Sequence, residues 1–194
     1  MEFIFATNNL NKVKEINNAL QGNYTICSLK DAGILIDIPE PYNTLEDNAR
    51  EKAVTIYQMT GKNCFSEDTG LEVDALNGAP GVRSARYAGD QANSTDNMEK
   101  LLHELSASTN RNARFRTVIC MILEGKELFF EGICNGTILR ERRGDEGFGY
   151  DPIFIPEGSL KTFAQMDTNE KNTFSHRKKA LDKMITYLNS RYAR

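Results

Sequence analysis

Residues 113–139 constrain the fold most, because they carry the longest strand-forming pattern in the chain. The stretch "ARFRTVICMILEGKELFFEGICNGTIL" contains two runs rich in β-branched and aromatic residues, separated by Glu124, Gly125 and Lys126. Two such runs around a short Gly-containing break predict a β-hairpin of two long strands. A long hairpin among helical segments favours an α/β fold built around a mixed sheet.

Shorter strand and helix patterns fill the rest of the chain. A helix is predicted over residues 45–60, where apolar residues recur at helical spacing between a Thr44 cap and Gly61. The stretch "FSEDTGLEV", residues 65–73, is interpreted as two short strand-like runs that meet at a Thr69-Gly70 turn. Since the chain has no repeat or linker, residues 1–194 are expected to form a single domain. The remaining predictions are strands at 2–7 and 24–29 and helices at 10–22, 94–105 and 175–192.

Composition narrows the class of protein. A hydrophobic fraction of 40% is ordinary for a globular protein, and a formal net charge of −3 argues against a dedicated nucleic-acid binder. No apolar run approaches the roughly 20 residues of a membrane helix, and the N-terminal residues lack a signal-peptide pattern. The four cysteines are widely spaced, which favours reduced, mostly buried thiols over a zinc site. We therefore expect a cytoplasmic protein.

Three carboxylates crowd into residues 65–73, namely Glu67, Asp68 and Glu72. Either they are solvated turn residues, or a positive group lies among them. Two predicted helices each place a cation, Lys52 or Arg177, on an apolar face, where a charge is costly unless it is paired or meets an anionic ligand. Each alone is explained by a long side chain that reaches the solvent, but two such cations beside an acidic cluster favour a pocket for a polyanion. The apolar stripes are Leu45, Ala49, Ile56 and Met59 around Lys52, and Leu181, Met184 and Leu188 beside Arg177.

Two loops add candidate ligand contacts. In "ATNNLNK", residues 6–12, a strand gives way to a helix, and the N-terminus of a helix favours an anion; the alternative is that an asparagine only caps this helix. In "GFGYDP", residues 147–152, Phe148 or Tyr150 could stack on a flat ring and Asp151 could accept from a ring N–H. The alternative for this second loop is a turn that buries its aromatic residues in the core.

Taken in order, these segments resemble the inosine triphosphate pyrophosphatase family, also described as XTP/dITP diphosphatases. The resemblance covers nearly the whole chain and rests on five motifs at matching order and spacing. Arg83 departs from the family pattern, because relatives often carry an aromatic residue there, which puts loop packing or dimer contacts in doubt more than the chemistry. The motifs are "TNNLNK", "LEDNAREKA", "SEDTGLEVDALNGAPGV" with "SARYAG", "GFGYDPIF" and "NEKNTFSHRKKAL".

The resemblance implies an elongated mixed β-sheet flanked by helices, with two lobes around a central cleft, in a protein that forms homodimers. It also implies Mg²⁺-dependent hydrolysis of ITP, dITP and XTP to the monophosphate and pyrophosphate, which removes deaminated purines from the nucleotide pool. By position, Glu46 and Asp68 would hold the metal, and Asp68 would also be the proton acceptor. The implied substrate contacts are Thr7, Asn8, Asn9, Leu10, Asn11, Lys12 and Lys52 for the phosphates, Thr69, and Phe148, Gly149, Tyr150, Asp151, Lys171, His176 and Arg177 for the nucleoside and base.

Two other functions compete with this interpretation. One is a related pyrophosphatase that acts on pyrimidine or standard nucleotides. The other is a nucleotide-binding regulator or an RNA-binding module without turnover. The acidic pair Glu67-Asp68 disfavours the second, since carboxylates repel phosphate unless a metal ion intervenes.

Overall fold

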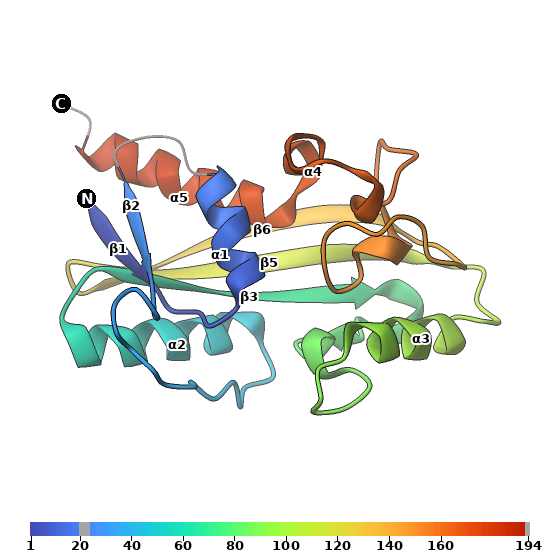
Figure 1. Ribbon diagram of the computed structural model, residues 1–194, viewed down its shortest axis with the longest axis horizontal. Coiled ribbons are helices and arrows are strands. Elements are labelled where there is room, and N and C mark those ends of the chain that lie inside the picture. The colour runs from blue at the N-terminus through green and yellow to red at the C-terminus, as the bar shows by residue number, and fades with distance from the viewer. Residues whose placement is uncertain (20–23, 193–194) are drawn as a thin grey trace. The chain divides into compact units, whose positions relative to one another are not determined.

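The computed structural model describes residues 1–19 and 24–192, and it confirms an α/β fold around a mixed sheet (Figure 1). Within these residues the sheet has seven strands in the order β2-β1-β3-β5-β6-β7, with β4 paired to β3. The predicted end of the first helix, residues 20–22, lies outside the described residues. The strands are β1 (Glu2–Phe5), β2 (Thr25–Ser28), β3 (Cys64–Val73), β4 (Pro80–Gly81), β5 (Asn112–Leu123), β6 (Lys126–Ile138) and β7 (Phe154–Pro156). The helices are α1 (Leu10–Ala19), α2 (Leu45–Thr60), α3 (Ser94–Glu104), α4 (Thr168–Phe174) and α5 (His176–Tyr192).

The sheet mixes parallel and antiparallel pairs. β1 runs parallel to both β2 and β3, and its residue Phe5 lies opposite Phe65 of β3. β7 runs antiparallel to β6. The predicted hairpin is confirmed, because β5 and β6 are joined at Glu124 and Gly125. The φ angles of these two residues, 52° and 78°, are those of the two-residue turn that matches the twist of a β-hairpin.

The chain divides into two compact units. The first unit contains Met1–Asp68, Thr117–Gly132 and Arg177–Arg194, and the second contains Thr69–Arg116 and Ile133–His176. Strands β3, β5 and β6 contribute residues to both units, and β3 passes from the first to the second after Asp68. The expectation of two lobes around a central cleft stays a prediction.

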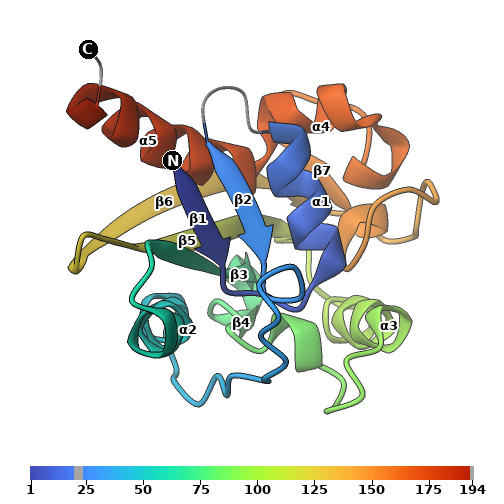
Figure 2. The same ribbon diagram turned by 60° about the vertical axis from the view of Figure 1, so that its left-hand side comes forward.

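Helices cover both faces of the sheet in the first unit, α1 and α5 on one face and α2 on the other (Figure 2). Successive residues of a strand point to opposite faces, and β1 follows this rule. Phe3 and Phe5 pack with residues of α1 and α5, whereas Ile4 and Ala6 pack with residues of α2. The α2 cap predicted from the sequence is also confirmed, since Thr44 accepts a hydrogen bond from the backbone N–H of Asp47.

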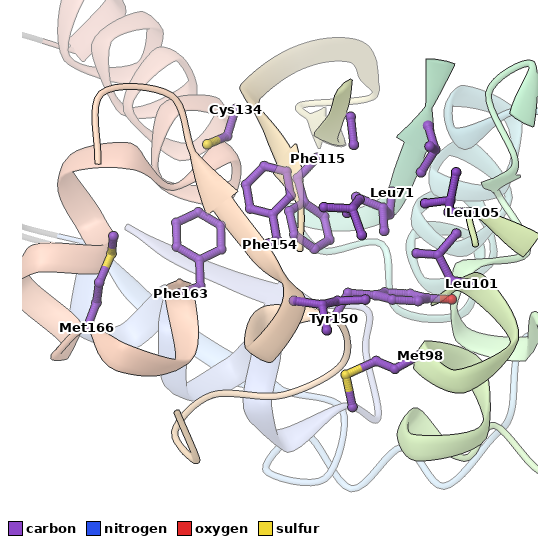
Figure 3. Close-up of a cluster of buried hydrophobic side chains, with 14 residues drawn as sticks. Leu71, Met98, Leu101, Leu105, Phe115, Cys134, Tyr150, Phe154, Phe163 and Met166 are labelled. Atoms are coloured by element: carbon purple, nitrogen blue, oxygen red, sulfur yellow. The ribbon is translucent and has the colours of Figure 1, made fainter. Parts of the chain in front are cut away.

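The second unit has its own hydrophobic cluster, shown in Figure 3. Aromatic residues from three segments meet there, with the rings of Phe115 and Phe154 centred 4.7 Å apart and those of Phe154 and Phe163 centred 5.3 Å apart. Helix α3 contributes Met98 and Leu101 to this cluster, and Leu105, the residue directly after the helix, also belongs to it. Tyr150 lies in the same cluster and is only 4% exposed.

The turn predicted at Thr69-Gly70 is wrong, because β3 is one continuous strand of ten residues. Gly70 is required there for another reason. A Cβ atom added to Gly70 would lie 2.6 Å from the carbonyl oxygen of Gly81 in the paired strand β4. The glycine therefore marks a close approach of two backbones.

Two helices differ from the predicted pattern. The apolar stripe of α2 includes Ala53 and ends at Ile56, so that Met59 is 56% exposed instead of buried. Helix α4 has no apolar stripe that a periodicity argument could detect. Helix α4 begins after a side-chain cap, because the Asp167 side chain accepts a hydrogen bond from the backbone N–H of Glu170.

The cysteines match the expectation of buried, reduced thiols. All four are free, with Cys64, Cys120 and Cys134 buried and Cys27 half-buried. Burial raises the pKa of the Cys64 and Cys120 thiols to about 12, so both remain protonated at neutral pH. Within residues 1–19 and 24–192, none of the helices has the length and apolar character needed to span a bilayer.

Candidate active site

In the first unit, the loop after β1 and the acidic residues of β3 lie at the same edge of the sheet. β1 and β3 are parallel, and the backbone N–H of Ala6, the first residue after β1, donates to the carbonyl of Phe65 at 2.8 Å. β1 ends there, while β3 continues through Glu67 and Asp68. The predicted phosphate loop, residues 7–12, therefore begins beside the two carboxylates.

The loop is shaped by its own asparagines. The Asn9 carboxamide oxygen accepts from the backbone N–H groups of Asn11 and Lys12 at 3.0 and 3.3 Å, which confirms that an asparagine caps α1. Asn8 donates to the carbonyl of Ile36 at 2.8 Å. Thr7 accepts from the backbone of Asn9, and Leu10 and Asn11 are exposed. The side chain of Lys12 is mostly buried, with 15% exposed.

Three cations converge on Glu67. The Arg177 Nε lies 2.9 and 2.8 Å from the two carboxylate oxygens of Glu67, and the Lys12 Nζ lies 3.3 Å from one of them. The Lys52 Nζ donates to the backbone carbonyl of Glu67 at 2.8 Å. Lys52 and Arg177 are only 7% and 3% exposed, which confirms the burial predicted from helical phase. That Lys52 and Arg177 face one shared cleft stays a prediction. Both contact Glu67, Lys52 through the backbone carbonyl and Arg177 through the carboxylate.

Two carboxylates outside the motif-matched positions join this cluster. Glu15 of α1 bonds the guanidinium of Arg177, 162 residues away in the chain. Glu40, in the segment before α2, bonds the Lys52 ammonium. Neither residue carries a recognisable sequence signal, because each lies next to its partner only in the folded chain.

The charged groups in the cluster shift the pKa values of one another. Burial alone would raise the pKa of Glu67, but the adjacent Arg177 and Lys12 lower it to about 2, so that the carboxylate is ionised at neutral pH. For Lys12, burial lowers the pKa and the nearby Lys52 and Arg177 lower it further, against the opposing effect of Glu67. Burial also disfavours the charge of Arg177, yet Glu67 and Glu15 raise its pKa.

Asp68 and Glu46 are the predicted metal ligands. Asp68 is 7% exposed, and one of its carboxylate oxygens lies 3.7 Å from the Lys52 Nζ. Glu46 lies half-buried in the first turn of α2. Within the part of the chain that the structure describes, no three acidic, histidine or cysteine side chains gather as a metal centre made by protein ligands alone.

In the second unit, Asp151 organises the "GFGYDP" loop. Its Oδ2 accepts from the backbone N–H of Phe148 at 2.9 Å and from the Lys171 Nζ at 2.7 Å. The Lys171 ammonium also lies over the ring of Phe148, 5.4 Å from its centre. Phe148 and Gly149 are half-buried, as is Thr69 of β3. Asp151, Lys171 and Phe148 thus form one group.

The other predicted nucleoside contacts of this unit have buried side chains. Tyr150 packs in the hydrophobic cluster (Figure 3), as expected for a turn that buries its aromatic residues in the core. Phe148 is less buried than Tyr150. His176 is 4% exposed, and its ring stacks on Phe115 with centres 4.7 Å apart and planes 12° from parallel.

Ser84 connects the "SARYAG" segment to the rest of the second unit. Its hydroxyl accepts from the backbone N–H of Leu71 at 2.8 Å and donates to the carbonyl of Gly81 at 2.6 Å. Its own carbonyl accepts from the Tyr150 hydroxyl at 2.9 Å. The Tyr150–Ser84 pair therefore ties the "GFGYDP" loop to strand β3.

Replacing Tyr150 with phenylalanine is expected to lower the free energy of unfolding by about 1–2 kcal/mol, because the buried Ser84 carbonyl loses its donor. Urea denaturation followed by circular dichroism measures this change. Tyr24→Phe is the matched control, since the hydroxyl of Tyr24 bonds Asn189 at an exposed position, and we expect less than about 0.5 kcal/mol there. Equal effects of the two variants would contradict a tie specific to Tyr150.

Known proteins are similar to this chain over nearly its whole length. The model of the Ham1 family matches residues 3–187. A protein from Flavobacterium psychrophilum named dITP/XTP pyrophosphatase is 52% identical over 187 residues, which cover 96% of this chain and 98% of the relative. A protein of the same name from Porphyromonas gingivalis is 48% identical over 188 residues, covering 96% and 97%.

Solved structures are similar as well. The Ham1 protein of Staphylococcus aureus superposes with a TM-score of 0.89 at 35% identity, covering 98% of this chain and 100% of that one. A nucleoside-triphosphatase, or dITP/XTP pyrophosphatase, from Mycobacterium abscessus superposes with a TM-score of 0.77 at 38% identity, covering 95% and 99%. The fold described above is thus the fold of these structures.

Proposed function

The chain belongs to the Ham1 family, and from that premise we propose that it hydrolyses dITP, ITP and XTP to the monophosphate and pyrophosphate. The family confirms the resemblance drawn from the five motifs. The activity makes the protein a nucleoside triphosphate diphosphatase, which cleaves between the α- and β-phosphates. Relatives about 50% identical over their full length carry this activity in their names.

One observation carries the proposal. Lys12, Lys52 and Arg177 come from three different helices and meet around Glu67, directly before Asp68 in the same strand. The acids Glu15, Glu40 and Glu67 pair these buried cations within the protein. Cations that are held together in this way can also contact the oxygens of a triphosphate, which is a polyanion. An activating carboxylate next to this group provides what hydrolysis of a phosphoanhydride requires.

Magnesium fits the carboxylates that are present. Mg²⁺ is usually held by one or two carboxylates together with water and the substrate phosphates, and Asp68 and Glu46 are two such carboxylates. We propose that Asp68 and Glu46 hold the ion. When bound, Mg²⁺ would neutralise charge on the phosphate oxygens.

The side chains of the first unit then have separate tasks. The Asp68 carboxylate accepts a proton from the attacking water, as a general base. Lys12 and Lys52 bind phosphate oxygens and balance the charge that develops on the leaving pyrophosphate. Neither task requires a covalent intermediate.

We propose that the base is recognised by residues that the family resemblance implies for the nucleoside. Phe148 offers a half-buried ring for stacking on the purine, and the neighbouring Asp151 and Lys171 offer polar contacts. We propose that Arg177 donates to the O6 atom of the base. Adenine presents a donor at this position, so it would leave the arginine unpaired, and an unpaired buried group discriminates strongly.

A substrate panel tests the function. The protein is incubated with Mg²⁺ and ITP, dITP, XTP, GTP, ATP or CTP, and both pyrophosphate and monophosphate are quantified. We expect kcat/KM for the three deaminated purines to exceed that for ATP and CTP by at least about 100-fold. Release of orthophosphate in place of pyrophosphate, or equal turnover of all six nucleotides, would refute the proposal.

The wider setting follows from the substrates. Hydrolysis of deaminated purine triphosphates removes them before a polymerase inserts them into DNA or RNA, and we propose this role for the protein. Its four free thiols suit the reducing conditions of the cytoplasm. We also propose a homodimer, which light scattering on the eluting protein would detect as twice the mass of the chain.

A further inference from the structure

Glu67 has no role among the motif-matched positions, yet its carboxylate contacts two buried cations, Lys12 and Arg177. Its side chain is fully buried, with 0% exposed. Both carboxylate oxygens contact the Arg177 Nε, and Oε1 also contacts Lys12. Its backbone carbonyl accepts from Lys52. One residue of β3 therefore contacts cations from α1, α2 and α5.

This geometry leaves Glu67 a different task from that of Asp68. Its carboxylate oxygens are directed at protein cations, at distances of 2.8 to 3.3 Å. A carboxylate in such bonds orients its partners in the way that outer residues orient the ligands of a metal site. Asp68, the next residue of the strand, points to the opposite face because side chains alternate along a strand.

The partners need to be held in place. Lysine and arginine have long side chains, and fixing one costs up to about 2 kcal/mol of rotamer entropy. Lys12, Lys52 and Arg177 also repel one another: burial is the main cause of the lowered pKa of Lys12, and the nearby Lys52 and Arg177 lower it further. A buried anion among them offsets this repulsion and fixes the geometry before a substrate arrives.

We infer that Glu67 is a positioning residue of the proposed reaction: it holds Lys12 and Arg177 in the geometry that binds the nucleotide, and it does not bind the metal. The inference rests on the proposed function for its kinetic part. Its geometric part, the bond between Glu67 and Arg177, can be measured without any substrate.

The test compares Glu67→Gln, which keeps the shape and removes the charge, with Glu67→Asp, which keeps the charge. Glu72→Gln is the matched control, because Glu72 lies in the same strand and pairs with Arg114 and Arg116 but has no assigned role. We expect Glu67→Gln to lower kcat/KM for ITP by about 10- to 100-fold, as loss of an orienting residue does. The Mg²⁺ concentration for half-maximal activity is expected to stay within about 2-fold. The kcat/KM of Glu67→Asp is expected to lie between those of Glu67→Gln and the wild type, because aspartate keeps the charge but its shorter side chain reaches the cations less well. Glu72→Gln is expected to match the wild type.

The bond between Glu67 and Arg177 is tested by NMR spectroscopy without any substrate. In the ¹⁵N NMR spectrum, the Arg177 Nε–H signal, identified by its loss in Arg177→Lys, is expected to exchange slowly with water in the wild type. Glu67→Gln is expected to accelerate this exchange at least about 10-fold, since a charge-assisted hydrogen bond is replaced by a weaker one. Because no nucleotide is present, this result stands even if the substrate panel fails.

Three outcomes would overturn the inference. A Glu67→Gln enzyme with wild-type kcat/KM would show that the charge positions nothing. A shift of the Mg²⁺ midpoint by 10-fold or more would make Glu67 a metal ligand. Tighter binding of ITP by Glu67→Gln would mean that the carboxylate only competes with phosphate. Should Glu67→Gln not fold, kcat/KM for ITP and the exchange of the Arg177 Nε–H are compared between Glu67→Asp and the wild type instead. Wild-type values of both quantities would then contradict the inference.

Discussion

Replacing Asp68 with asparagine is expected to lower kcat for ITP by about 1,000-fold or more. The carboxylate is the proposed general base, and such a base contributes about 10²–10⁴-fold to a rate. It is also a proposed ligand of the metal ion, so the loss combines two effects. Asparagine has the same size as aspartate, so we expect the packing around this residue, which is 7% exposed, to be retained. Initial rates of pyrophosphate release at saturating ITP and Mg²⁺ measure the loss.

Asp74→Asn provides the control for Asp68→Asn. Asp74 follows β3 directly, is exposed, and lines a polar cavity of about 530 Å³ in the second unit that has no assigned role. Its variant is expected to retain wild-type kcat. Should Asp68→Asn keep more than a tenth of the activity while Asp74→Asn is unaffected, another group must be the base.

Replacing Lys52 with methionine is expected to lower kcat/KM for ITP by about 10²–10³-fold, the cost of removing one preorganised charge partner from a transition state. The methionine retains most of the apolar stem on the buried face of α2, so the loss reports mainly on the charge. Because Glu40 and Asp68 then lose a neighbouring cation, we also expect a lower free energy of unfolding. Steady-state kinetics and thermal unfolding separate the two effects.

Lys62→Met is the matched control for Lys52→Met. Lys62 lies just beyond the C-terminal cap of the same helix, its side chain is 66% exposed, and its Nζ is 3.9 Å from Glu2. An exposed ion pair of this kind contributes little to stability, so we expect wild-type kinetics and unfolding. A Lys52→Met enzyme that is less stable but has normal kcat/KM would restrict Lys52 to a structural role.

Much of the fold could be predicted because its signals are local. The hairpin at Glu124-Gly125 and the caps of α2 depend on residues adjacent in sequence. The burial of Lys52 and Arg177 could be predicted as well, since helical phase alone places both on an apolar face.

The errors have a common physical cause. Gly70 resembles a turn residue, and only the approach of Gly81 from another strand shows why β3 continues through it. The partners of Lys52 and Arg177 in the first unit were equally hidden, because Glu15 lies 162 residues from Arg177 and Glu40 belongs to a segment without regular structure. Sequence patterns report which residues are buried, but they do not report which distant side chain meets them.

The net charge of the cluster around Glu67 has a consequence for the form of the nucleotide that the proposed function requires. Seven linked side chains carry the formal charges, three positive and four negative, which leaves a net charge of −1 before substrate arrives. The four acids thus outnumber the cations that would receive a triphosphate, and an uncomplexed nucleotide would meet net repulsion. If the protein has the proposed function, we expect the site to favour a nucleotide that brings its own divalent counter-ion. The concentration of the magnesium complex, not of total nucleotide, is then expected to govern the rate. The seven are Lys12, Lys52 and Arg177 with Glu15, Glu40, Glu67 and Asp68.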